Sequence, residues 1–126
     1  MSPRILLVED EADLLLAMRI LLEGHGYAVI DATTGADGLR AVERERPDLV
    51  VLDVGLPDVD GLDVLAKLRE RPLADQPVVV MLSAHASGHT AAKARELGCD
   101  RYVTKPFDPD ELVETIESML DRPTDS

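Results

Sequence analysis

VVLDVGLPDVDG, residues 50–61, starts as an apolar, strand-like run and then reaches a bare carboxylate, Asp53. Runs that are apolar at nearly every position are typical of strands covered on both faces, as in parallel sheets. A carboxylate adds nothing to the packing of such a strand, because removing its charge from water costs free energy. The position of Asp53 therefore indicates a functional side chain at the end of a strand.

The rest of the chain alternates between strand-like and helix-like segments. Short runs rich in leucine and β-branched residues predict strands at 5–8, 27–30, 49–52, 78–82 and 101–104. Segments with helical spacing of apolar residues predict helices at 12–26, 35–45, 60–70, 91–97 and 107–120. Asp60 and Asp108 are the expected N-caps of the third and fifth helices. Strict alternation with short connections predicts an α/β protein, in which a doubly wound parallel sheet carries helices on both faces.

Composition points to one soluble domain. The 126 residues suffice for a single domain with a substantial core, and no apolar run is long enough to span a membrane. The first residues do not resemble a signal peptide, so a cytoplasmic location is expected. The single cysteine, Cys99, agrees with a reducing compartment and is expected to be a small buried residue. The net charge of −12 argues against direct binding to nucleic acid or to anionic membranes.

Three acidic residues follow strands at what should be one edge of the sheet. Glu9 and Asp10 come directly after the first predicted strand, and Asp53 comes directly after the third. The carboxyl ends of parallel strands share an edge, and ligands of such sheets bind there. Like charges at close range repel one another, whereas a hard divalent cation with oxygen ligands relieves the repulsion. The sequence therefore predicts a cation site, with Mg²⁺ as the natural candidate.

Further polar side chains should reach the same edge. Ser83 follows the fourth predicted strand, and Lys105 with Pro106 follows the fifth. Taken singly, each residue has an ordinary alternative, since Ser83 could cap a helix and the acids could favour a helix N-terminus. Those alternatives do not explain why a hydroxyl, an ammonium and three acids all map to one edge of the sheet.

Four segments, in this order and spacing, resemble the receiver domains of bacterial two-component response regulators, such as the chemotaxis regulator. They are LLVEDE (6–11), VVLDVGLPDVDGL (50–62), VVVMLSA (78–84) and GCDRYVTKPF (98–107). The resemblance covers nearly the whole chain. It implies a flavodoxin-like (βα)5 three-layer sandwich with a five-stranded parallel sheet in the order 2-1-3-4-5. Residues 1–121 would form the receiver domain, and 122–126 a polar tail or the start of a linker.

The resemblance assigns the acidic residues to phosphoryl transfer in a two-component phosphorelay. Asp53 would be the phosphoacceptor, which takes a phosphoryl group from a phosphohistidine. Asp10, Asp53 and the backbone carbonyl of Gly55 would bind Mg²⁺ directly, and Glu9 would act through water. Mn²⁺ or Ca²⁺ would be expected to substitute for Mg²⁺. Such a domain assists its own phosphorylation and dephosphorylation and is not a conventional turnover enzyme.

The resemblance also implies a switch and its partners. Lys105, at the solvent edge of the site, would neutralise phosphoryl oxygens, and its bond to Pro106 would be cis. Ser83 would donate to a phosphoryl oxygen, and Tyr102 would then swing inward. A sensor histidine kinase or a histidine phosphotransfer protein would supply the phosphoryl group. The fourth helix, fifth strand and fifth helix would form the face that contacts a downstream output domain or protein.

Two other classes of function remain open. A haloacid-dehalogenase-like phosphatase also places an aspartate nucleophile after a strand, but its motif has a second acid two residues on, where this chain has Gly55. A pseudo-receiver would bind other proteins without being phosphorylated. Such a module is expected to lack one or more of Asp10, Asp53 and Lys105, and this chain has all three.

Overall fold

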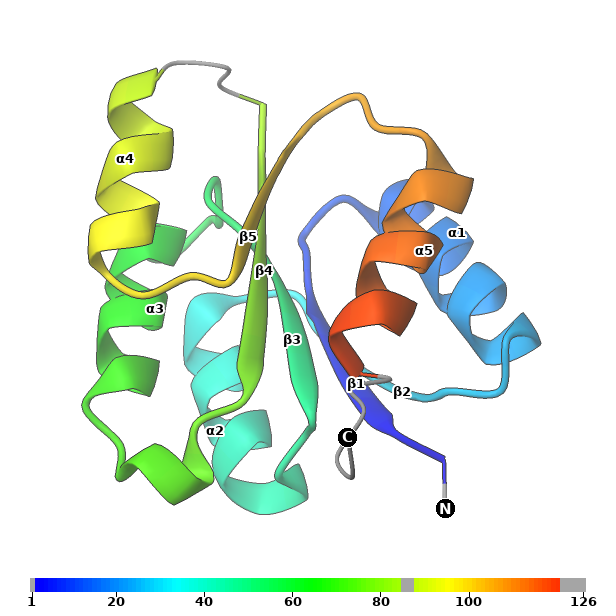
Figure 1. The fold of residues 1–126 in the computed structure, drawn as a ribbon, viewed down its shortest axis with the longest axis horizontal. Helices are drawn as coiled ribbons and strands as arrows, with labels where there is room; N and C mark the ends of the chain where they lie inside the picture. The colour runs from blue at the N-terminus through cyan, green and yellow to red at the C-terminus, as the bar shows by residue number, and fades with distance from the viewer. Residues whose placement is uncertain (1, 85–87, 121–126) are drawn as a thin grey trace.

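The chain folds into a five-stranded parallel sheet with helices on both faces (Figure 1). The structure is a computed structural model that describes residues 2–84 and 88–120. The strands are β1 (Arg4–Val8), β2 (Ala28–Ala32), β3 (Leu49–Asp53), β4 (Val78–Ser83) and β5 (Arg101–Thr104). They pair in the order β2-β1-β3-β4-β5, which confirms the predicted three-layer α/β fold.

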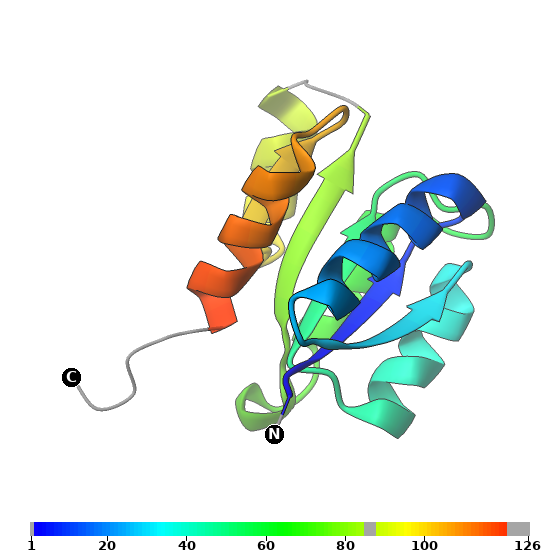
Figure 2. The same ribbon diagram turned by 90° about the vertical axis from the view of Figure 1, so that its right-hand side faces the viewer.

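The helices are divided between the two faces of the sheet (Figures 1 and 2). One face carries α1 (Ala12–Gly24) and α5 (Pro109–Leu120), and the other carries α2 (Gly35–Glu45), α3 (Gly61–Arg69) and α4 (Gly88–Glu96). Helix α4 begins earlier than predicted, because glycine and threonine have low intrinsic helix propensity and the sequence pattern there is weak. A short 3-10 helix, η1 (Leu73–Asp75), was not predicted, since so short a segment carries no recognisable period.

Side chains of the central strands alternate between two apolar cores. Ile5 and Leu7 of β1 belong to the core under α1 and α5, whereas Leu6 and Val8 belong to the core under α2, α3 and α4. All four side chains are essentially buried. Each fully buried leucine or isoleucine of this kind stabilises the fold by roughly 1.5–3 kcal/mol. β1, β3 and β4 are therefore buried along almost their whole length, while the edge strand β5 is only partly covered.

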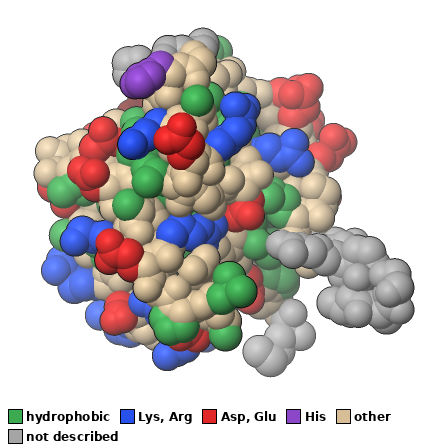
Figure 3. Space-filling view, turned by 60° about the vertical axis from the view of Figure 1, so that its left-hand side comes forward, with side chains coloured by type: hydrophobic (Ala, Val, Ile, Leu, Met, Phe, Trp, Pro, Cys, Tyr) green, Lys and Arg blue, Asp and Glu red, His purple; other side chains and the backbone are tan. Residues whose placement is uncertain are grey.

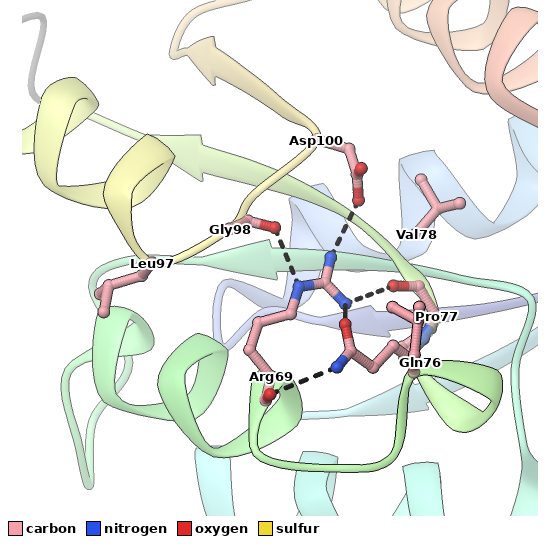
Figure 4. Close-up of a pocket in the computed structure, with 8 residues that line it drawn as sticks. Arg69, Gln76, Pro77, Val78, Leu97, Gly98 and Asp100 are labelled. Atoms are coloured by element: carbon pink, nitrogen blue, oxygen red, sulfur yellow. Dashed lines mark hydrogen bonds and ion pairs between the residues drawn. The ribbon is translucent and has the colours of Figure 1, made fainter.

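Arg69, at the end of α3, fastens the amino-terminal ends of β4 and β5 (Figure 4). Its guanidinium donates to the carbonyls of Gly98 and Pro77, at 2.9 and 2.7 Å, and pairs with Asp100 at 2.9 Å. Asp100 also accepts from the N–H of Val79 at 2.8 Å. The Arg69 network lies at the end of the sheet opposite to the predicted site.

Basic and acidic side chains are interspersed over the face shown in Figure 3.

Some expectations need correction or fall outside the described residues. Cys99 is only half-buried, because it lies in the connection that leads into the partly covered edge strand β5. This burial still raises the pKa of its thiol. The predicted tail, 122–126, lies outside the described residues. Within 2–84 and 88–120, each helix is too short or too polar to cross a lipid bilayer.

Candidate functional site

The strand register brings the predicted residues to the carboxyl edge of the sheet. β1 and β3 end at the same level, so Glu9 and Asp53 leave neighbouring strands together. β4 and β5 also end level with each other, at Ser83 and Thr104. One carboxylate oxygen from each of Glu9, Asp10 and Asp53 lies within 4.8 Å of the others. The predicted convergence of the three acids is therefore confirmed.

The three carboxylates differ sharply in exposure. Glu9 is 1% exposed and Asp53 is 5% exposed, whereas Asp10 is exposed. The two oxygens of Glu9 accept from the N–H of Glu11 and from Nζ of Lys105, both at 3.0 Å. Burial raises the pKa of Glu9 and the charge of Asp53 adds to the rise, while the Glu11 N–H and Lys105 oppose it. Glu11 was not predicted as part of the site, although its place in the acidic run 9–11 was a signal.

Lys105 lies between two buried carboxylates. Its Nζ is 3.0 Å from Glu9, 3.2 Å from Asp53 and 3.8 Å from Glu11. The Lys105 side chain is only 17% exposed, so the expectation of a solvent-edge ammonium is wrong. Burial alone would lower the pKa of Lys105, but the hydrogen bonds and charges of Glu9 and Asp53 outweigh it, and the pKa is raised. The bond between Lys105 and Pro106 is cis, as expected.

The loop after β3, residues 54–60, holds the Asp53 carboxylate. The N–H of Gly55 donates to Oδ1 of Asp53 at 3.2 Å. The N–H of Gly61, at the start of α3, donates to the carbonyl of Val54 at 2.8 Å. Gly61 lies so close to the strand end that a Cβ there would be 2.2 Å from the backbone oxygen of Asp53. Only glycine therefore closes the loop at this point without displacing the strand end.

Gly61→Ala is expected to destabilise the fold by about 3 kcal/mol, because the added methyl group meets backbone atoms that cannot rotate away. Urea unfolding followed by circular dichroism measures the loss. Gly24→Ala is the matched control, because a Cβ at Gly24 meets nothing within 4 Å. Gly24 is the last residue of α1, so that change should stabilise by at most about 1 kcal/mol, the upper value for a glycine in the middle of a helix. Equal stabilities of Gly61→Ala and wild type would show that the loop relaxes around the methyl group.

Ser83 and Tyr102 lie on neighbouring strands. Ser83 is fully buried at the end of β4, and its backbone carbonyl accepts from the N–H of Lys105 at 2.7 Å. Tyr102 pairs in register with Met81 and is half-buried in β5. The roles assigned to Ser83 and Tyr102 belong to a phosphorylated state, and they stay predictions.

The acidic cluster suits a hard cation. Its three donors are carboxylate oxygens, the ligand type that Mg²⁺ and Ca²⁺ prefer. The ammonium of Lys105 contacts two of the three carboxylates, so the cluster keeps an excess of negative charge. The cluster of Glu9, Asp10 and Asp53 could therefore hold a metal ion, with Asp10 on its exposed side.

Sequence comparison finds close relatives among transcriptional regulators. The transcriptional regulatory protein KdpE of Mycobacterium tuberculosis (strain ATCC 25618 / H37Rv) is 45% identical over 120 residues. The match covers 95% of this chain and 52% of KdpE. The chain thus spans about half the length of this relative.

Solved structures share the fold and the family. A response regulator receiver domain protein (CheY-like) from Methanospirillum hungatei JF-1 has a TM-score of 0.89 at 33% identity, covering 96% of this chain and 95% of that chain. The receiver domain of a sensor histidine kinase from Pseudomonas aeruginosa PAO1, with magnesium coordinated in its active site cleft, has a TM-score of 0.86 at 26% identity, covering 97% and 100%. The family model of the response regulator receiver domain matches residues 5–117, and the chain therefore belongs to this family.

Proposed function

We propose that the chain is the phosphoacceptor receiver of a two-component phosphorelay. The observation that carries this proposal is the Asp53 carboxylate, which is 5% exposed at the end of β3 and contacts both the Lys105 ammonium and the Gly55 N–H. Phosphoryl transfer depends mainly on positioning and on cations that offset charge on the phosphoryl oxygens. A fixed nucleophile beside a fixed ammonium meets both needs.

In the proposed reaction an oxygen of Asp53 attacks the phosphorus of a phosphohistidine on the partner protein. An O–P bond forms while the N–P bond breaks, and the electron pair of that bond returns to the imidazole nitrogen. Lys105 offsets the negative charge on the transferred phosphoryl oxygens. Water later hydrolyses the acyl phosphate and restores the carboxylate, so each cycle depends on a new phosphodonor.

Asp10, Asp53 and the backbone carbonyl of Gly55 would hold Mg²⁺, and Glu9 would reach it through water. The carboxylate cluster fits such an ion, and one related receiver domain has magnesium in its active site cleft. Bound there, the ion would supply charge stabilisation to the phosphoryl oxygens. Mn²⁺ or Ca²⁺ would substitute.

Ser83 and Tyr102 would transmit the effect of phosphorylation to the surface of this chain that contacts a downstream partner. Ser83 would donate to a phosphoryl oxygen, and Tyr102 would then move inward and alter the face formed by α4, β5 and α5. KdpE is a transcriptional regulatory protein of which this chain covers about half, and this supports an output domain as the downstream partner. The donor would be a sensor histidine kinase or a histidine phosphotransfer protein. Residues 1–121 would form the receiver, with 122–126 as a tail or linker.

Incubation with acetyl phosphate and Mg²⁺, followed by intact mass measurement, tests the proposed function. We expect one phosphoryl group per chain, which hydroxylamine removes because it cleaves acyl phosphates. Replacing Mg²⁺ with a chelator should prevent the modification. A chain left unmodified by acetyl phosphate and by histidine kinases would instead be a pseudo-receiver, a binding module that works without phosphorylation.

Mg²⁺ is expected to raise the melting temperature, because it offsets repulsion among Glu9, Asp10 and Asp53. At tenfold its Kd, a ligand that binds only the folded chain adds about 1.4 kcal/mol, which moves the midpoint for a domain of this size by several degrees. Ca²⁺ should act similarly, and Na⁺ at equal ionic strength should not. Asp10→Asn should lose most of the shift while keeping the buried contacts of Glu9. Identical wild-type melts with and without Mg²⁺ would mean that the acids do not share a cation.

A further inference from the structure

Asp58, at the tip of the loop after β3, binds the first turn of α2. Its Oδ1 accepts from the N–H of Gly35 at 2.8 Å, and its Oδ2 accepts from the N–H of Ala36 at 3.0 Å. These N–H groups belong to a helix N-terminus, where they have no partner within the helix and where the helix dipole favours negative charge. The two hydrogen bonds lower the pKa of Asp58. One carboxylate thus joins two segments that lie more than 20 residues apart.

Packing at the same point leaves little freedom between the loop tip and α2. A Cβ built on Gly35 would lie 2.4 Å from Cγ2 of Val59 and 3.0 Å from Cγ2 of Val64. Val59 is the neighbour of Asp58, so the loop tip rests directly on the backbone of α2. Glycine at position 35 permits this close approach, and Asp58 supplies the polar bonds across it.

The opposite end of the loop carries the site. The Gly55 N–H holds Asp53, and the Gly61 N–H bonds to Val54, so the loop base is fixed at the strand end. Gly55 also forms a bridge with Asp60. The segment between Asp53 and Gly61 is therefore anchored at its base by its own backbone and at its tip by α2.

We propose that Asp58 is a positioning residue, which holds the loop so that Asp53 and the Gly55 carbonyl stay arranged for a cation. This inference rests on the proposed function. Groups that orient metal ligands without touching the metal commonly contribute tenfold or more to affinity, because the ligands would otherwise have to be ordered on binding. Asp58 does this by linking the loop to a helix that packs on the sheet itself.

Thr34 offers a matched control on the same helix end. Its Oγ1 accepts from the N–H of Asp37 at 3.1 Å and so caps α2. Thr34→Ala removes this cap, whereas Asp58→Ala removes the tie between α2 and the loop. Both changes weaken the start of α2, and only the second releases the loop.

The test measures Mg²⁺ affinity by isothermal titration calorimetry, and amide hydrogen exchange of residues 54–60 without metal. Asp58→Ala is expected to raise the Mg²⁺ dissociation constant about tenfold and to speed exchange in the loop. Thr34→Ala should leave both close to wild type. Asp58→Asn keeps one acceptor oxygen but loses the charge. If Asp58 acts by holding the loop in place, the Mg²⁺ dissociation constant and the loop exchange rate of Asp58→Asn should lie between those of wild type and Asp58→Ala. Equal effects of Asn and Ala on affinity, with unchanged loop exchange, would show a role of charge alone and overturn the proposal.

The two readouts separate this inference from the proposed function. Wild-type chain that binds no Mg²⁺ would refute the cation site and the positioning role with it. If wild type binds Mg²⁺ and Asp58→Ala binds it equally well, the cation site stands and the positioning role is wrong. Equal losses of affinity in Thr34→Ala and Asp58→Ala would also overturn the proposal, because they would trace the effect to α2 alone.

Discussion

Asp53→Asn is expected to take up no phosphoryl group from acetyl phosphate and Mg²⁺, while remaining folded. The amide oxygen is a much weaker nucleophile than a carboxylate, so the attack on phosphorus is lost. The shape of the side chain is almost unchanged, and its remaining oxygen can still accept from Gly55 or from Lys105. Intact mass measures the modification, and circular dichroism checks the fold.

Asp63→Asn is the matched control for this substitution. Asp63 is an exposed carboxylate in the first turn of α3, outside the acidic cluster. This variant should be phosphorylated as wild type is. Phosphorylation of Asp53→Asn to the wild-type extent would place the acceptor elsewhere, and peptide mapping of Glu9 and Asp10 would then be the next measurement.

The arrangement of elements was predictable from sequence because local signals agree with the final packing. The apolar run that ends at Asp53 is the buried central strand β3, and all five of its residues are buried. Asp60 and Asp108 cap their helices as predicted, accepting from the N–H groups two residues on, both at 2.9 Å. Alternation of strands and helices then predicts a parallel sheet, since each right-handed crossover returns the chain to the same sheet. The strand order β2-β1-β3-β4-β5 came instead from the resemblance to receiver domains.

The contacts inside the site were not predictable in the same way. Glu9 and Asp10 are neighbours in sequence, yet the first is buried and the second exposed. The Glu9 carboxylate is held by the N–H of Glu11 and by Nζ of Lys105. The position of Lys105 depends on contacts with residues 96 and 52 positions away in the chain. A local sequence pattern does not encode contacts between residues that lie so far apart in the chain. Sequence therefore predicts which residues reach the edge of the sheet, and tertiary structure decides which of them touch.

The Lys105 side chain is largely buried against two carboxylates, so its removal should destabilise the fold. Glu9 and Asp53 are almost completely buried, and the Lys105 ammonium binds both. Without it, two carboxylates would face each other in a poorly hydrated site. Breaking a buried ion pair by removing one partner costs about 3–5 kcal/mol. Because Asp10 opens one side of the cluster to water, we expect Lys105→Ala to lose about 3 kcal/mol of unfolding free energy at neutral pH without metal.

The pH dependence of the unfolding free energy, and its response to Mg²⁺, show whether the loss in Lys105→Ala comes from the buried carboxylates. Lys105 opposes the burial that raises the pKa of Glu9, so Lys105→Ala should raise this pKa further. A carboxyl group whose pKa is raised by folding destabilises the folded chain as pH rises from the ordinary pKa of 4.5 through the folded-state pKa. The difference between Lys105→Ala and wild type should therefore shrink as pH falls below 4.5, where Glu9 is protonated in both proteins.

At neutral pH, Mg²⁺ should restore part of the stability of Lys105→Ala, because it replaces the lost positive charge. Lys67→Ala, which removes an exposed lysine of α3, should change stability by no more than about 0.5 kcal/mol. Urea unfolding of wild type and both variants across pH, with and without Mg²⁺, measures these differences. If Lys105→Ala is as stable as Lys67→Ala at neutral pH without metal, Lys105 does not neutralise the buried carboxylates, and its contribution is confined to the phosphoryl group.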